Sequence, residues 1–286
     1  MRCPVINYVQ AAGGWGIFFL YAPLLAILYF SPFSWLVSVD WQRPEFSYCF
    51  FIPFIFLYLI FDKRKIFNSV PAAPTWKGLW LVGAGIVLYW LGELGGEFYS
   101  LYLSFWLLIT GICWVHWGWR KMKVVIFPLL FPLAMFPQPN FIYIEISVKL
   151  KLLASQIGVF LLQLFGFSAF REGNIIDLGY MQLQVVDACN GIRFLNPLVV
   201  LGLLVAYLSR MALWKKMTLV ISTVPLAVIT NSFRISMVGI LYKFFGSQAA
   251  EGFFHDFTGW VIFVISLVFL FVEVWILQKM FSKKCT

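Results

Sequence analysis

Charged side chains are scarce in this sequence. Lys, Arg, Asp and Glu make up 12% of the 286 residues, against roughly 25% in an ordinary soluble domain. This leaves too little polar surface to cover a water-exposed body of this size. The chain holds two histidines, and its five cysteines form no C-x-x-C pair. The spacing supports neither a zinc site nor a dithiol redox centre, and no metal or organic cofactor is expected.

Several catalytic signatures are also missing. The sequence contains no Gly-rich phosphate loop, no His-x-x-Glu-His helix, no Ser-His-Asp order and no paired intramembrane aspartates. Nucleotide, metalloenzyme, serine and aspartyl chemistries therefore have no support. The 21 basic residues exceed the 12 acidic ones, but they lie in short clusters between apolar segments. Without a continuous basic stripe, no nucleic-acid partner is expected.

Apolar residues dominate instead, at 62% of the chain, and aromatic residues reach 20%. This composition predicts an all-α integral membrane protein, with residues 1–286 forming a single polytopic membrane domain. Long apolar segments indicate about eight transmembrane helices. They lie near residues 15–37, 46–61, 76–94, 98–118, 122–137, 190–209, 216–244 and 257–280.

Basic clusters alternate with connections that are poor in positive charge. The clusters around 63–65, 120–123, 210–216 and 279–284 are interpreted as cytoplasmic. The connections around 40–45, 93–97, 136–139 and 243–256 are expected to face outward. The alternation holds if 141–165 does not cross the membrane, and it then puts both termini in the cytoplasm.

The segment 141–165 carries one polar stripe, formed by Glu145, Lys149, Gln156 and Gln163. Periodicity allows either an interfacial amphipathic helix or a ninth span with its stripe turned into the bundle. The charge alternation favours the interfacial helix. Residues 168–188 then change character, and alternation around Gln182 and Gln184 with Gly179 at a turn predicts a short extracytoplasmic β-hairpin.

Cys189 lies where this hairpin leads into an apolar helix, followed by Asn190, Gly191 and, one turn on, Arg193. A helix N-terminus and a nearby guanidinium both favour a thiolate. The alternative is that Cys189 is simply a small buried apolar side chain.

Arg234 lies 18 residues beyond residue 216, which places it about 27 Å up the span, near the outer boundary of a hydrocarbon layer about 30 Å thick. Ionisable groups at that depth are functional candidates, although the side chain could instead reach the outer headgroups. Asn231, three residues earlier, could orient it.

His255 lies on the same outward side, just before the last span. It could be a solvated loop side chain, yet it is the one outward imidazole available to a cysteine. A thiol, an imidazole and a guanidinium from three segments would supply the groups that acyl transfer requires.

At these residues the sequence resembles the exosortase/archaeosortase family of membrane cysteine transpeptidases. The matching motifs are Arg171-x-Gly173, Ala188-Cys189-x-Gly191-Ile192-Arg193, Asn231-x-x-Arg234 and His255-Asp256-x-x-Gly259, in the family's order. Two departures are Asn190, where Ser is commoner, and Phe46-Ser47-Tyr48-Cys49, where a Tyr-Ser-His-Gly stretch is frequent.

The resemblance implies an enzyme of the bacterial inner membrane, with its active site on the extracytoplasmic side. Its partners would be membrane-anchored exported proteins with a C-terminal sorting signal of the PEP-CTERM kind, together with membrane lipids. By the same resemblance, Cys189 would form a thioester, His255 would transfer protons and Arg234 would hold the oxyanion. Supporting or substrate-binding roles would fall to Asn231, Arg193, Arg171 and Asn190. The acyl acceptor and the oligomeric state stay open.

Three other functions fit parts of the sequence. A transporter would predict internal repetition, which the two halves do not show. A non-enzymatic assembly protein for exopolysaccharide or envelope export would leave Cys189 inert. An outward-facing thiol oxidoreductase would need a second cysteine, for which Cys49 is the one outward candidate.

Overall fold

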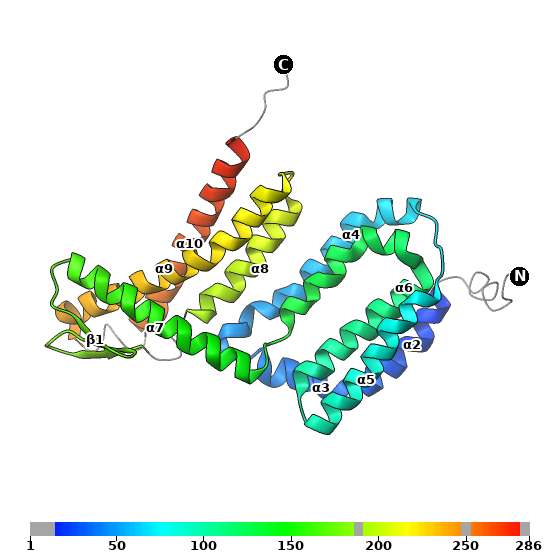
Figure 1. Cartoon of the computed structure of the whole chain (residues 1–286), viewed down its shortest axis with the longest axis horizontal. Coiled ribbons are helices and arrows are strands. Elements are labelled where there is room, and N and C mark those ends of the chain that lie inside the picture. The colour runs from blue at the N-terminus through cyan, green and yellow to red at the C-terminus, as the bar shows by residue number, and fades with distance from the viewer. Residues whose placement is uncertain (1–14, 186–190, 247–252, 281–286) are drawn as a thin grey trace, which may run out of the picture. The chain divides into compact units, whose positions relative to one another are not determined.

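The computed structural model describes residues 15–185, 191–246 and 253–280, and the side chains among them except those of 15–20, 245 and 253–256. The chain forms two compact units, residues 1–139 and 140–286. Helices make up most of both units (Figure 1).

The first unit is entirely helical in its described residues. Its α-helices are α2 (Trp15–Leu28), α3 (Phe30–Trp35), α4 (Ile52–Ser69), α5 (Leu79–Gly95) and α6 (Phe98–Leu130). Shorter turns connect them: a π-helix at Leu36–Asp40 and 3-10 helices at Pro44–Phe51, Trp76–Gly78 and Phe131–Met135.

Helices α5 and α6 pack closely because glycines line their contact. A β-carbon at Gly85 would lie 2.9 Å from Leu108, and one at Gly92 would lie 2.8 Å from Leu101. Small residues allow two helix backbones to approach each other in this way, as is common inside membranes.

Helix α6 folds back on itself at Gly118. This residue has φ 73° and ψ 170°, which is not helical, and a β-carbon there would collide with the Ala73 carbonyl oxygen. Trp106 Nε1 donates a hydrogen bond to the Leu129 carbonyl, although 23 residues would separate the two by about 34 Å in a straight helix. The segment is therefore two antiparallel limbs, with the break where the sequence predicted one.

The second unit is built around α9 (Leu213–Phe245), which packs against α7 (Asn140–Leu164), α8 (Ile192–Leu208) and α10 (Phe253–Lys279) (Figure 1). Its small sheet contains β1 (Phe170–Glu172), β2 (Ile175–Asp177) and β3 (Gln182–Gln184). The strands are antiparallel in the order β1-β2-β3. The core between sheet, α7 and α9 includes Leu162, Ile176, Val185 and Ile235.

The predicted two-stranded hairpin is therefore wrong in its number of strands. The turn at Gly179 is present, with φ 78°. A second turn follows from Gly173, whose φ of 61° lets the chain reverse between Glu172 and Ile175. A single glycine beside an asparagine is enough for such a two-residue turn.

The expected eight spans are not what the described residues show. Five helices are long and apolar enough to cross a membrane: Pro44–Ser69, Trp76–Gly95, Phe98–Met135, Leu213–Phe244 and Phe257–Lys279. A sixth is possible if Tyr21–Leu28 and Phe30–Asp40, which are bent by 63°, form one broken span. Two features make the number of spans lower than the expected eight. The expected spans 98–118 and 122–137 lie in one helix, Phe98–Met135, which counts once despite its fold at Gly118. The expected span 190–209 corresponds to Ile192–Leu208, which is a shorter apolar helix.

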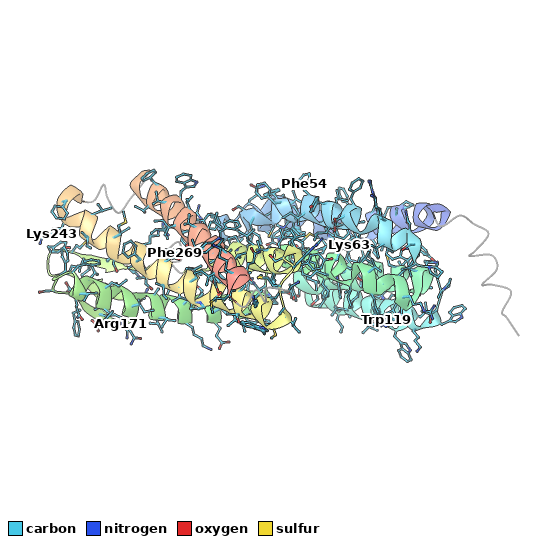
Figure 2. All side chains as sticks on the ribbon, turned by 90° about the horizontal axis from the view of Figure 1, so that it is seen from above. Phe54, Lys63, Trp119, Arg171, Lys243 and Phe269 are labelled. Carbon is cyan, nitrogen blue, oxygen red and sulfur yellow. The ribbon has the colours of Figure 1, made fainter. Side chains whose placement is uncertain are left out.

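The outer surfaces of both units agree with a lipid environment. Large apolar side chains such as Phe54 and Phe269 point outward, with 71% and 56% of their surface exposed (Figure 2). An all-α membrane protein with a small sheet is thus the architecture that the structure supports.

Helix α7 is not among the helices that qualify as spans in the described chain. All four residues of its polar stripe, from Glu145 to Gln163, are exposed, and Lys149 Nζ donates to Glu145 Oε1 at 2.6 Å. The buried face carries small residues instead and packs on α9, where Ser236 Oγ donates to the Gly158 carbonyl at 3.0 Å. The stripe is thus not turned into the unit, as a ninth span would have required.

Candidate functional site

Arg234 is the largest fully buried side chain among the described residues, with 1% of its surface exposed. Its guanidinium carbon lies 5.4 Å from the centre of the Phe194 ring on α8. On the α10 side, a β-carbon at Gly259 would lie 3.3 Å from Arg234 Nη2. The guanidinium thus contacts both α8 and α10, the two helices that pack beside each other against α9 (Figure 1).

The stretch of α9 around Arg234 is unusually polar for the interior of a membrane protein. Buried neighbours are Thr230, Asn231, Ser232 and Ser236. Their hydroxyls largely donate to carbonyls of the same helix: Thr230 Oγ1 to Leu226, Ser232 Oγ to Val228 and Ser236 Oγ to Ser232. Hydroxyls satisfied in this way add little cost inside the membrane, whereas a buried guanidinium costs several kcal/mol to desolvate. The guanidinium of Arg234 is therefore the most costly group to bury in this stretch of α9.

Asn231 connects this site to the start of α8. A β-carbon at Gly191 would lie 3.2 Å from Asn231 Nδ2, and Gly191 has φ 84°, a left-handed conformation that side chains disfavour. The Gly191 carbonyl accepts from the main-chain N–H groups of Phe194 and Leu195 at 3.1 and 2.9 Å. Gly191 therefore starts α8 while its backbone rests on Asn231.

Val185, four residues before Cys189, is also anchored by hydrogen bonds. Val185 donates its N–H to the Asn174 carbonyl at 2.9 Å, and its own carbonyl accepts from Asn174 Nδ2 at 3.1 Å. Its side chain is buried. Residue 185 is thus fixed by the sheet and residue 191 by α9, so five intervening residues, 186–190, connect two anchored points.

Arg171 fixes the sheet to α7. Its Nη1 donates to the Gly173 carbonyl at 3.0 Å and reaches the Leu152 carbonyl at 3.5 Å. Ser155 Oγ donates to the same Gly173 carbonyl at 3.3 Å. These bonds account for the Arg-x-Gly spacing as a means of holding the β1–β2 turn.

The β2–β3 turn is held against α9. Tyr180 Oη donates to the Gly239 carbonyl at 3.0 Å, and a β-carbon at Gly239 would lie 3.2 Å from Leu178. Nearby, Lys243 Nζ lies 5.0 Å from the centre of the Phe167 ring. Arg171 and Lys243 thus lie at the same end of the unit (Figure 2).

A buried lysine fixes the opposite end of the α9–α10 pair. Lys215 Nζ donates to the carbonyls of Leu277 and Met280 at 2.6 and 2.5 Å, at the C-terminal end of α10. A cation there complements the helix dipole. Lys215 and Arg234 are 234 − 215 = 19 residues apart, or about 28 Å along α9. That spacing is close to the hydrocarbon thickness of a bilayer, about 30 Å.

The structure brings some of the expected site residues together and not others. Arg234 and Asn231 are buried side by side in α9, whereas Arg193 is exposed and Arg171 belongs to the sheet contact. His255 lies in α10 one turn before Gly259, but its side chain is outside the described residues. Cys189 and Asn190 also lie outside the described residues.

Cys49 is buried in the first unit, with its Sγ 4.0 Å from the Ala134 carbonyl oxygen. Tyr48 Oη donates to the same carbonyl at 3.2 Å. Both residues therefore help to hold the 3-10 turn at Phe131–Met135. This burial does not favour the thiol oxidoreductase reading, which needs an accessible second cysteine.

Comparison with known protein families assigns the chain to one of them. The family model described as transmembrane exosortase matches residues 41–272, which is most of the sequence and includes every motif around Arg234. The chain belongs to the transmembrane exosortase family. No curated protein and no solved structure matches it.

Three residues that matter for this exosortase site were not singled out from the sequence. Phe194 contacts the guanidinium, Asn174 anchors Val185, and Lys215 fixes the end of α10. Gly259 was named as a motif residue, but its contact with the guanidinium was not predicted. Lys215 resembled any other member of a basic cluster, and its burial is a property of the packing.

Proposed function

We propose that this exosortase is a membrane-embedded cysteine transpeptidase. It would cleave the C-terminal sorting signal of exported proteins through a thioester at Cys189. The observation that carries the proposal is the buried Arg234 guanidinium, enclosed by Phe194 and Gly259 beside an Asn231 that supports Gly191. A buried cation at the junction of three helices is costly, and stabilising a developing negative charge is a function that accounts for it.

The short sequence distances from Cys189 to Gly191 and from His255 to Gly259 support the roles assigned to the thiol and the imidazole. Cys189 is two positions before Gly191, so their α-carbons are at most about 7 Å apart. His255 precedes Gly259 by four residues in α10, or about 6 Å along the helix axis. Both residues are therefore tied closely to backbone positions that contact Asn231 or Arg234.

The proposed reaction has two steps. In the first, the Cys189 thiolate attacks the scissile carbonyl carbon, and Arg234 stabilises the oxyanion that forms. The oxyanion then collapses, the C–N bond breaks, and the C-terminal fragment leaves as an amine that takes a proton from His255. In the second, water or an amine attacks the thioester carbonyl and gives a proton to His255, and the C–S bond then breaks to return the Cys189 thiolate.

The burial of Arg234 suits this role. In a site that largely excludes water, a hydrogen bond to an oxyanion is worth more than in solution. The planar guanidinium can offer two parallel donors, which a lysine cannot. The Phe194 ring lies against the guanidinium, and Gly259 leaves the space that Nη2 occupies.

We assign the site to the extracytoplasmic side of the inner membrane and both termini to the cytoplasm. The spacing of Lys215 and Arg234 supports this assignment, because it puts one cation at each boundary of the hydrocarbon layer. Lys215 belongs to the basic cluster expected in the cytoplasm, which leaves Arg234 at the outer boundary.

The test is cleavage of a reporter in cells. The reporter is a secreted protein fused to a host-encoded tail with a short Pro-containing signal, an apolar span and basic end. The native protein should shorten it, whereas Cys189→Ala and Cys189→Ser should leave it intact while remaining in the membrane. Cys49→Ser is the matched control and should cleave normally. Full cleavage by Cys189→Ala would refute the proposal.

A further inference from the structure

The strand β3 has a free edge and lies a few residues before the proposed nucleophile in the sequence. The sheet order is β1-β2-β3, so β3 pairs with β2 on one side only within the sheet. Gln184, its last residue, is 189 − 184 = 5 residues before Cys189, a span of at most about 18 Å.

The direction of the main-chain groups of β3 follows from the hydrogen bonds at its two ends. Val185 N–H donates to the Asn174 carbonyl, and Leu178 N–H donates to the Met181 carbonyl. Hydrogen-bonded pairs alternate with non-bonded pairs in an antiparallel ladder. The pair Ile176 and Leu183, which lies between these two, is therefore also hydrogen-bonded, and the N–H and C=O groups of Gln182 and Gln184 point away from β2.

These outward groups are available for pairing. Within the described parts of the chain, nothing forms a hydrogen bond with the main chain of Gln182 or Gln184. Both residues are exposed, and Leu183 between them is half-buried. An extended peptide laid along this edge would find two N–H donors and two C=O acceptors at the spacing of a strand.

The two edges of the sheet differ in how they are protected. Proteins commonly protect sheet edges with charges or proline. The β1 edge carries Arg171 and Glu172, whereas β3 reads Gln-Leu-Gln, with no charge and no proline. Hydrogen bonds made by Tyr180 and Asn174 anchor the chain just before and just after β3.

From this we infer that the β3 edge binds an extended segment of the substrate protein by strand addition, next to the scissile bond. The inference rests on the proposed function. Recognition by strand addition uses main-chain hydrogen bonds for affinity, so the neutral edge would accept substrates with varied side chains. The uncharged glutamines impose no charge requirement on the partner.

The first test separates the main-chain N–H from the side chain at one position. Gln184→Pro removes the outward N–H without removing a bond to β2, because Leu183 makes that bond. Gln184→Ala keeps the N–H and is the matched control. Loss of one such bond should lower reporter cleavage about tenfold in Gln184→Pro, while Gln184→Ala should stay within about twofold of the native protein.

Normal cleavage by Gln184→Pro would overturn the inference and leave the proposed function intact. A failure of the proposed function looks different, since the native protein would then leave the reporter whole or Cys189→Ala would cut it. Equal losses in Gln184→Pro and Gln184→Ala would also overturn the inference, because they would point to the side chain.

A second measurement does not depend on catalysis or on a proline. A photoreactive amino acid is placed at Gln184, or at Phe170 on β1 as a control, in the Cys189→Ser protein. Phe170 is exposed as well. Cross-linking to the reporter from position 184 and not from 170 supports the inference. No cross-link from 184, or equal yields from both positions, would overturn it.

Discussion

Arg234 on α9 and Gly259 on α10 are in such close contact that a β-carbon at position 259 would lie 3.3 Å from the guanidinium Nη2. Position 259 follows His255 by one turn of the same helix. The space that the glycine leaves open thus sets the distance between the helix carrying the imidazole and the buried cation.

Enlarging residue 259 should displace the guanidinium. Gly259→Ala requires a shift of a few tenths of an ångström and should lower reporter cleavage several-fold, whereas Gly259→Val should abolish it. Gly83→Ala is the matched control, since a β-carbon there meets nothing within 4 Å. Reporter cleavage with membrane abundance checks the result. Full activity of Gly259→Val would show that this contact does not matter.

Replacing Arg234 should abolish cleavage. Arg234→Met keeps much of the side-chain volume but removes the guanidinium donors, so reporter cleavage should be lost. The amount of the variant in the membrane is measured alongside, and cleavage is compared for equal amounts of protein. Arg234→Lys should rescue poorly, because a point charge cannot replace the planar fork. A cleaving Arg234→Met protein would contradict the oxyanion role.

A side chain at residue 191 should destabilise the start of α8. Gly191 has φ 84°, and its missing side chain leaves room for Asn231. Gly191→Ala should therefore cost about 1–2 kcal/mol, read as a lower midpoint in thermal unfolding of the detergent-solubilised protein. Gly95→Ala, a helical position with nothing within 4 Å, should leave the midpoint unchanged or higher. Equal midpoints for the two variants would count against the contact.

Removing Lys215 should loosen the C-terminal end of α10. Lys215→Met deletes two hydrogen bonds to the end of this helix and should lower the free energy of unfolding by about 1–3 kcal/mol. The neighbouring Lys216→Met serves as the control and should have a smaller effect. A Lys215→Met protein as stable as the control would mean that these bonds contribute nothing.

Labelling with a membrane-impermeant maleimide tests the assigned sidedness. In intact cells, the reagent should modify a cysteine introduced at Gln182 on β3, in a protein whose own cysteines have been replaced. It should not modify one introduced at Lys63. The opposite pattern would overturn the assigned topology.

The sequence predicted where the apolar helices lie, because this depends on local composition, but it overestimated how many of them are long enough to be spans. The break near residue 118 could be predicted from the basic cluster that follows it, and the fold at Gly118 lies there. The extra strand was missed because Gly173 was read only as part of a motif. Its turn depends on a backbone conformation that the residue type permits without requiring.

The site could be predicted in part. A buried arginine in an apolar segment is visible in the sequence, and so is Asn231 one turn away. Gly191 and Gly259 were visible as motif residues, but their contacts depend on how α8 and α10 pack on α9. The burial of Lys215 depends on the register of two helices, which no local pattern encodes.

The most direct test of the account is to trap the acyl-enzyme. The native protein and Cys189→Ala are each incubated with the reporter, quenched in acid and analysed by mass spectrometry. The account predicts the reporter's N-terminal fragment attached to Cys189 through a bond that neutral hydroxylamine cleaves. Reporter cleavage with no such adduct, and unchanged in Cys189→Ala, would contradict it.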